Sequence, residues 1–424
     1  MLGAAQLVAA VIGGRNFDTV LGRAGLYGAV RAATMDLAYS TLRACGRGDF
    51  LLGRLLERPL ADVTVRALLL VALTRLEVRP EEAHTTVDQA VTAALQVAGG
   101  RFKSLVNGVL RSFLRRREAL LAQADADPVA NWRHPAWWIA RLQQDHPAHW
   151  QGILAAGNTH PPLCLRVNRR RVCPAGPGQT PAQLFCAQLE AACIPARALD
   201  DVAILLDKPL PLDRISGFGA GLCSVQDWGA QAAAGLLDVQ NGMRVLDACA
   251  APGGKTAHLL ESADIELTAL DADIARVARI TENLQRLGLA ASVKVADARA
   301  VDGWWDGRPY QRILADVPCT ASGVVRRHPD AKWLRREGDI AGFAATQKAI
   351  IDALWRTLAP GGKMLYATCS VFSRENALQV EGFLGRHADA RLLPDAGATS
   401  GQAQRFQLPD AEHDGFYYAL LQKD

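Results

Sequence analysis

Two cysteines lie at the carboxyl ends of apolar segments of strand length, a pattern that could bring two thiols together. Cys319 closes the tetrapeptide DVPC just after the segment 310–316, and Cys369 lies near the end of the segment 362–370. A single cysteine is most often a small buried hydrophobic residue. Two of them at the carboxyl ends of neighbouring strands would open onto one crevice, which favours a shared chemical role over simple packing.

Two thiols beside an acid suit the methylation of carbon 5 of cytosine, a poor nucleophile in the intact ring. A thiolate that adds to carbon 6 makes carbon 5 enamine-like, so that it can attack a methylsulfonium group; a base then removes the carbon 5 proton and the thiol is eliminated. Asp316 is the candidate acid, as a protonated carboxyl at ring nitrogen 3. A paired base must first leave its stack, so a single-stranded or flipped nucleotide is expected. The spacing does not decide which thiol is the nucleophile.

A loop of small residues follows the first apolar segment of this region, 243–248. It runs from Cys249 to Lys255 as CAAPGGK, and small residues let a ligand approach the backbone closely. The loop matches neither the dinucleotide fingerprint nor the P-loop. Asp271 ends the next segment, where a carboxylate can accept both hydroxyls of a ribose. This arrangement suits NAD and S-adenosylmethionine alike, with a plain glycine turn as the alternative.

Strand and helix segments alternate from residue 240 onward, which predicts a parallel sheet with helices on both faces. Ligands of such sheets bind at the carboxyl ends of the strands. The predicted strands are 243–248, 266–271, 292–297, 310–316 and 362–370, the clearest helices are 272–288 and 341–358, and a last antiparallel strand is 415–422.

The first 121 residues have helical periodicity instead. Five apolar residues fall at the spacing of one helix face: Val65, Leu68, Leu69, Ala72 and Leu73. Residues 122–131 are small and polar with one proline, which predicts a linker. The segment 132–235 mixes short strands and helices and is expected to form a small α+β module.

Length, charge and cysteine content limit the classes of protein to which the chain can belong. A length of 424 residues fits two or three domains. The net charge of +4 does not by itself indicate a nucleic-acid partner, but residues 1–125 carry 16 basic and 11 acidic side chains, a net charge of +5. None of the nine cysteines forms a C-x-x-C pair, which argues against a zinc ribbon and favours a reducing compartment. No uncharged apolar stretch reaches the roughly 18 residues of a membrane span.

Two basic segments are candidate RNA contacts, and a solvated surface is the alternative for each. The first clusters around a predicted helix: Arg101, Lys103, Arg111, Arg115, Arg116 and Arg117. The second follows Cys319 directly and is predicted to hold RNA phosphates beside the site: Arg326, Arg327, His328, Lys332, Arg335 and Arg336.

Three motifs closely resemble the RsmB (Sun/Fmu) family of bacterial 16S ribosomal RNA cytosine-5 methyltransferases. They are VLDACAAPGGKT (245–256), DVPCTASGVVRRHPD (316–330) and ATCS (367–370). The segment KSLVNGVLR (103–111) is similar to the NusB-like helical domain that precedes the catalytic part in this family. The resemblance therefore extends over nearly the whole chain.

The resemblance implies a fold class and a set of roles. It implies a Rossmann-like α/β methyltransferase sheet (236–424), preceded by an all-helical NusB-like RNA-binding domain (1–125) and a small α+β module (126–235). Cys369 would be the nucleophile, and Cys319 would assist release of the methylated RNA. Glu375 and Asn376 either support the site or merely begin a helix. S-adenosylmethionine would be held by Cys249, Ala250, Ala251, Pro252, Gly253, Gly254, Lys255, Asp271, Asp297 and Asp316.

The expected substrate is 16S ribosomal RNA, and the expected enzyme is a cytoplasmic monomer with no metal and no membrane partner. Two other classes compete with this hypothesis. An NAD-dependent dehydrogenase would have to explain both strand-end cysteines and the missing dinucleotide fingerprint. A non-enzymatic RNA-binding factor built around the helical part would leave the catalytic motifs without a purpose.

Overall fold

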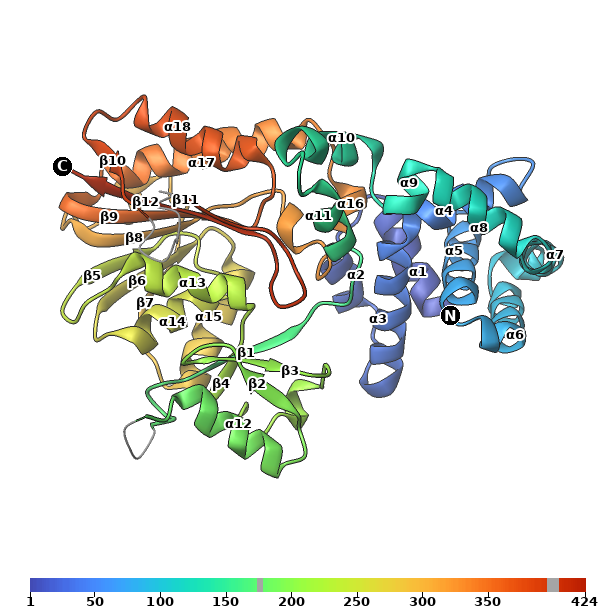
Figure 1. Cartoon of the computed structure of the whole chain (residues 1–424), viewed down its shortest axis with the longest axis horizontal. Helices are drawn as coiled ribbons and strands as arrows, with labels where there is room; N and C mark the ends of the chain where they lie inside the picture. Colours follow the sequence, from blue (N-terminus) through green and yellow to red (C-terminus); the bar gives the residue numbers. More distant parts are fainter. Residues whose placement is uncertain (174–177, 395–403) are drawn as a thin grey trace. The chain divides into compact units, whose positions relative to one another are not determined.

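The computed structural model describes residues 1–173, 178–394 and 404–424. Two compact units make up the chain. The first contains Met1–His160 together with Val325–Glu337, and the second contains Pro161–Val324 together with Gly338–Asp424. The first unit consists of helices, and the second contains both sheets (Figure 1).

The helical unit is built around α5 (Val63–Val78), which begins at the capping residue Asp62. The five residues predicted for one face of this helix are all buried, and so are Ala67, Leu70 and Val71. A helix that is apolar all round lies in the middle of a bundle rather than on its surface. Its neighbours are α1 (Leu2–Ile12), α2 (Phe17–Arg23), α3 (Gly28–Arg43), α4 (Cys45–Leu55), α6 (Ala83–Leu95), α7 (Lys103–Arg115) and α8 (Arg117–Ala126).

The prediction of a linker at 122–131 is wrong, because these residues are almost all helical. Helix α8 continues to Ala126, and α9 (Pro128–Trp132) follows it at once. The Asp127 side chain accepts a hydrogen bond from Ala130 N at 2.8 Å, and Pro128 occupies the first helical position. Asp followed by Pro is thus a helix start here, and the helices continue through α10 (Ala136–Asp145) and α11 (Trp150–Ala156).

The basic segment after Cys319 belongs to the helical unit, and two of its six members are buried there. Lys332, at 0% exposure, lies in α16 (Ala331–Leu334). Its ammonium donates to Arg43 O, Arg133 O and the Asn158 side chain at 2.9–3.1 Å. Arg326 is also buried, and its carbonyl accepts two hydrogen bonds from Arg43. The predicted phosphate contact is therefore wrong for Lys332 and Arg326, which support the fold.

The small module in the second unit is a four-stranded antiparallel sheet with one helix. Its strand order is β2-β3-β1-β4. Helix α12 (Pro181–Ala191) starts with a capping box between Thr180 and Gln183. The strands are β1 (Leu163–Val167), β2 (Ala196–Ala198), β3 (Ala203–Leu206) and β4 (Cys223–Val225).

The larger sheet confirms the predicted α/β class. Its order is β10-β12-β9-β8-β5-β6-β7, with β11 paired to β12. The five strands from β9 to β7 are parallel, and β12 is antiparallel to β9, as predicted. The strands are β5 (Arg244–Asp247), β6 (Glu266–Asp271), β7 (Ser292–Val295), β8 (Tyr310–Asp316), β9 (Leu358–Thr368), β10 (Ala390–Leu392), β11 (Gln404–Gln407) and β12 (Phe416–Lys423).

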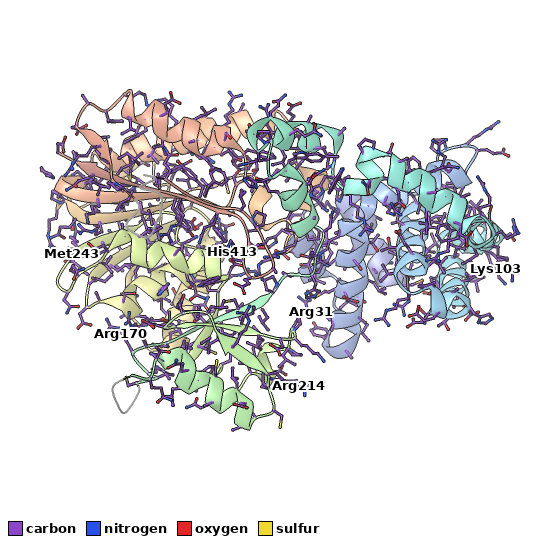
Figure 2. The ribbon with its side chains drawn as sticks, viewed as in Figure 1. Arg31, Lys103, Arg170, Arg214, Met243 and His413 are labelled. Carbon is purple, nitrogen blue, oxygen red and sulfur yellow. The ribbon has the colours of Figure 1, made fainter. Side chains whose placement is uncertain are left out.

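Helices cover both faces of this sheet (Figure 1). One layer holds α13 (Trp228–Leu237), α14 (Gly254–Ser262) and α15 (Ile274–Leu287), and the other holds α17 (Asp339–Trp355) and α18 (Ala377–Leu384). Adjacent residues of β8 therefore belong to different cores, with Ile313 in one and Leu314 in the other. Burial on both faces explains why the strands read as continuous apolar runs. In Figure 2, Met243 lies just before β5, at the end of the sheet where this strand begins. His413 lies toward the opposite end, just before β12.

A buried ion pair joins the small module to α14. Arg166 of β1 is 0% exposed, and its guanidinium makes two 2.8 Å hydrogen bonds to the carboxylate of Glu261. The same guanidinium donates to Gly254 O at 2.7 Å and to the side chain of Gln226. Two charges removed from water need this full set of partners. The hydrogen bond from Arg166 to Gly254 O fixes the first turn of α14, where the small-residue loop ends.

Arg166→Met should lower the free energy of unfolding by about 3–5 kcal/mol, because it leaves the Glu261 carboxylate buried without a cation. Chemical denaturation followed by circular dichroism measures the loss. Arg170→Ala is the control: Arg170 lies just after β1 (Figure 2) and its ion pair with Asp264 is exposed, so it should cost less than about 1 kcal/mol. The double variant Arg166→Met/Glu261→Leu should regain much of the loss. Equal losses in Arg166→Met and Arg170→Ala would contradict the assignment.

Candidate active site

The pairing of β8 with β9 brings the two cysteines together. Parallel register sets Asp316 opposite Ala367, so both strands end at the same edge of the sheet. Beyond that edge, the Sγ atoms of Cys319 and Cys369 lie 3.3 Å apart. Cys319 is 9% exposed, and Cys369 is partly exposed. The two strand-end thiols are therefore neighbours in the fold, although 50 residues separate them in sequence.

Backbone hydrogen bonds hold the two cysteine loops against each other. Val317 N donates to Ala367 O at 3.1 Å, and Gly323 N donates to Cys369 O at 2.8 Å. Gly415 N donates in turn to Gly323 O at 2.9 Å. A Cβ atom on Gly323 would lie 2.3 Å from Gly415 O, so only glycine permits this approach. The thiol separation therefore follows from the backbone as well as from the side chains.

Lys255 and Asp316 form an ion pair beside the thiols. Lys255 Nζ lies 2.7 Å from Asp316 Oδ2, with the two side chains 13% and 28% exposed. Burial favours the neutral amine, but the attraction of Asp316 outweighs it and raises the pKa of Lys255, with a smaller contribution from Cys369. The ammonium also lies 5.5 Å from the ring centroid of Phe416, within cation–π range. A fixed positive charge thus adjoins both Asp316 and Cys369.

The loop between β5 and α14 meets the end of β6, as the sequence predicts for a cofactor site. Asp271 is 5% exposed, and its carboxylate accepts a hydrogen bond from Ala251 N at 3.2 Å. Gly253 has φ +95°, a left-handed conformation that favours glycine. At Gly254 a Cβ atom would meet nothing closer than 3.9 Å. A glycine in the first turn of a helix lets a ligand group approach the backbone.

Asp247, at the end of β5, contains a buried polar atom without a partner. Its Oδ2 accepts a hydrogen bond from the Thr256 hydroxyl at 2.7 Å, whereas its Oδ1 has no hydrogen-bond partner. Burial raises the pKa of this carboxyl to about 7. A buried, unsatisfied oxygen beside a glycine-rich loop needs explanation. A polar ligand in the loop would satisfy it.

Asp297 and Cys249, two further residues predicted for the cofactor site, differ in the charge that their surroundings favour. The carboxylate of Asp297 is 41% exposed and pairs with Arg299 at 2.6 Å, which lowers the pKa of Asp297. Burial raises the pKa of the Cys249 thiol, and the negative charges of Asp316 and Asp247 raise it further. Cys249 is therefore held in the neutral form.

Glu375 and Asn376 support the cysteine loops. Both are fully buried. Glu375 accepts hydrogen bonds from Thr320 and Ser370, and Asn376 donates to Ser370 O at 2.8 Å. The alternative that these residues merely begin a helix is thereby excluded. The sequence motifs contain the two partners, Thr320 and Ser370, whereas Glu375 and Asn376 follow the last motif, and nothing in the spacing indicated that they touch.

Among the described residues, no group of three or more His, Cys, Asp or Glu side chains is arranged to hold a metal ion. In the same residues, no helix combines the length and the apolar character that crossing a membrane requires.

Three family models match consecutive parts of the chain. The NusB family matches residues 4–115, a ferredoxin-like domain of RsmF/B-like methyltransferases matches 134–213, and the 16S rRNA methyltransferase RsmB/F matches 234–422. The NusB-like class of the helical part is confirmed, while the three domain boundaries stay predictions.

Curated relatives match over almost their full length. Ribosomal RNA small subunit methyltransferase B of Pseudomonas syringae pv. tomato is 42% identical, over 100% of this chain and 96% of that protein. The protein of the same name from Vibrio cholerae is also 42% identical, over 92% and 89%. Identity at this level across the whole chain shows common family membership.

Solved structures agree with the fold. A crystal structure of PH0851 superposes with a TM-score of 0.81 at 22% identity, covering 100% of this chain and 98% of that one. NSun6 from Pyrococcus horikoshii, solved with SFG, has a TM-score of 0.59 at 19% identity, covering 68% and 98%. From the full-length relatives, the matched models and the shared fold, the chain belongs to the RsmB/F family of 16S rRNA methyltransferases.

Proposed function

We propose that this protein transfers a methyl group from S-adenosylmethionine to carbon 5 of a cytosine in 16S ribosomal RNA through a covalent adduct with Cys369. The observation that carries the proposal is the pair of thiols 3.3 Å apart at the ends of β8 and β9, beside the Lys255–Asp316 pair. Family membership supports the ribosomal RNA substrate, because the curated relatives are named for the small subunit RNA.

The proposed reaction begins with the Cys369 thiolate. Its sulfur adds to carbon 6 of the cytosine, and negative charge develops toward ring nitrogen 3. The Lys255 ammonium places a positive charge near this sulfur. Asp316 acts at nitrogen 3, and the Lys255 ammonium 2.7 Å from its carboxylate can supply the proton. Carbon 5 thereby becomes nucleophilic enough to accept a methyl group.

The residues between β5 and β6 fit S-adenosylmethionine, which supplies an electrophilic methylsulfonium when bound. The unsatisfied Asp247 Oδ1 can accept a hydrogen bond from the ligand, and Asp271 can accept the ribose hydroxyls. Because Gly254 has no side chain, a polar group can approach the backbone of the first turn of α14. Cys249 to Lys255, Asp271, Asp297 and Asp316 form the proposed cofactor site.

As carbon 5 accepts the methyl group, the proton at ring nitrogen 3 returns to the Lys255–Asp316 pair. Release of the RNA then requires elimination. The carbon 5 proton leaves to water, its electron pair forms the ring double bond, and the carbon 6–sulfur bond breaks toward Cys369. Cys319 assists this step, because its S–H can donate a hydrogen bond to the leaving thiolate 3.3 Å away.

The helical unit is proposed to bind the RNA by charge. The basic side chains around α7 that are exposed are Arg101, Lys103, Arg111, Arg115 and Arg116, and Figure 2 labels Lys103 on this helix. The buried face of α7 packs into the core through Val106, Leu110 and Phe113. An outer face rich in arginine is suited to phosphate contacts.

Cys369→Ala should reduce methyl transfer to 16S RNA by at least about 10³-fold, because covalent catalysis loses its nucleophile. Transfer of a labelled methyl group to the RNA measures the loss, and bisulfite sequencing of ribosomal RNA from cells with and without the protein identifies the nucleotide. Cys193→Ala is the control, since Cys193 is exposed in the turn after α12. Methyl transfer by Cys369→Ala at the rate of the control would overturn the assignment.

Cys319→Ala should accumulate a covalent protein–RNA adduct, because attack by Cys369 continues while the elimination loses its hydrogen-bond donor. Denaturing electrophoresis with labelled RNA separates the adduct from free protein. The double variant Cys319→Ala/Cys369→Ala should form none. If Cys319→Ala gives only free protein while the methyl group is still transferred and released, Cys319 has no part in release.

Replacement of Arg111, Arg115 and Arg116 by Ala should weaken RNA binding and lower the dependence of affinity on salt. Three lost phosphate contacts correspond to a slope of log K against log salt smaller by about 2. Binding titrations at several salt concentrations give the slope. Arg23→Ala, on the separate helix α2, serves as a control for loss of charge alone. An unchanged slope in the triple variant would place the RNA elsewhere.

A further inference from the structure

One buried carboxylate links the neighbours of both thiols. Glu375 follows the Cys369 loop in a short 3-10 turn, Ser373–Glu375, and its side chain is fully buried. Among the described residues, no Lys or Arg forms an ion pair with it, so hydrogen bonds alone satisfy the charge. A buried carboxylate without a cation costs free energy, which suggests that it has a specific task.

The hydrogen bonds of Glu375 are distributed over the two cysteine loops. Oε1 accepts from Thr320 N at 2.9 Å, and Oε2 accepts from the hydroxyls of Thr320 and Ser370, both at 2.5 Å. Thr320 directly follows Cys319, and Ser370 directly follows Cys369. A single side chain thereby restrains both thiols through their nearest neighbours in the chain.

Two residues of the surrounding core anchor Glu375 itself. Gln347 of α17 donates to Oε1 at 3.1 Å and to Pro318 O at 3.0 Å. The Tyr366 hydroxyl of β9 donates to Glu375 O at 2.5 Å. Glu375 is thus fixed to a sheet strand through its backbone carbonyl and to a covering helix through its carboxylate, so its position does not depend on the two cysteine loops alone.

The carboxylate also acts on Cys319 by its charge. The hydrogen bond with Cys369, burial, the charge of Cys369 and the charge of Glu375 together raise the pKa of the Cys319 thiol well above its ordinary value. Lys255, in contrast, places a positive charge near Cys369. The surroundings of Cys319 therefore favour the neutral, protonated form of its thiol.

We propose that Glu375 is a positioning residue for release of the methylated RNA, because its hydrogen bonds to Thr320 and Ser370 hold Cys319 against Cys369. This inference rests on the proposed function and adds to it a residue that need not touch the RNA. In the elimination, the carbon 6–sulfur bond breaks, its electron pair goes to Cys369 Sγ, and the carbon 5 proton leaves to water. A protonated Cys319 can stabilise that leaving thiolate; an ionised Cys319 would repel it.

Glu375→Gln tests the charge while keeping the shape of the side chain. Removing the negative charge lets Cys319 ionise at lower pH, so the alkaline fall of the release rate should move to lower pH by roughly one unit. Single-turnover experiments with the full-length protein and labelled RNA measure methyl transfer and decay of the adduct separately across pH. Methyl transfer should change less than about threefold, because Cys369 and Lys255 are retained.

Glu381→Gln is the matched control, since Glu381 is an exposed glutamate on the nearby helix α18, and it should behave as the wild type. Glu375→Asp is the second variant: it keeps the charge but is too short to reach both loops. It should slow release at least about tenfold without moving the pH profile. Circular dichroism checks that each variant is folded.

The outcomes separate this inference from the proposed function. If the wild type methylates no cytosine, or Cys319→Ala traps no adduct, the proposed function fails. If both behave as proposed but Glu375→Gln has the release rate and pH profile of the wild type, only the role of Glu375 is overturned. A Glu375→Gln variant that slows release with an unshifted profile would also overturn the charge-based role and leave a purely structural one.

Discussion

The parallel pairing of β8 with β9 is the constraint on which the site depends. The register sets Asp316 opposite Ala367, so β8 and β9 end next to each other. The two cysteine loops that follow them therefore begin side by side. The neighbouring pairing of β5 with β8 and of β5 with β6 brings the small-residue loop and Asp271 to the same edge. A slip of one residue in a strand would turn every side chain to the other face.

The sheet brings the loops and helix α14 close together, and buried polar groups then fix their positions. Arg166 joins the small module to both ends of α14, through Gly254 in its first turn and Glu261 in its last. Glu375 joins the loops of the two thiols. Each group gives up hydration and is stable only with its full set of partners. Such networks favour one geometry over its near alternatives, which is what the proposed covalent reaction requires.

The segment that follows Cys319 illustrates how charge in a sequence can mislead. Its six basic residues lie next to the motif that contains Cys319, so the local sequence suggests a phosphate-binding loop. In the fold, the segment Val325–Glu337 belongs to the helical unit, where Lys332 satisfies three buried oxygens with its ammonium. Burial of a lysine leaves no sign in the local sequence, because the acceptors come from Arg43, Arg133 and Asn158, far away along the chain.

The sequence by itself determined the α/β class, the strands and their order along the chain, the helical first part and the residues that surround the cysteines. These follow from local signals: apolar runs of strand length, helical periodicity and motifs that resemble those of one family. Only the tertiary structure decided that the thiols lie 3.3 Å apart, that Glu375 binds both of their loops, that Arg166 clamps α14, and that residues 122–131 are helical. These features depend on partners distant in sequence, or on a capping residue whose role becomes clear only once its helix exists. Hydrogen bonds and burial act across space, so spacing along the chain does not contain them.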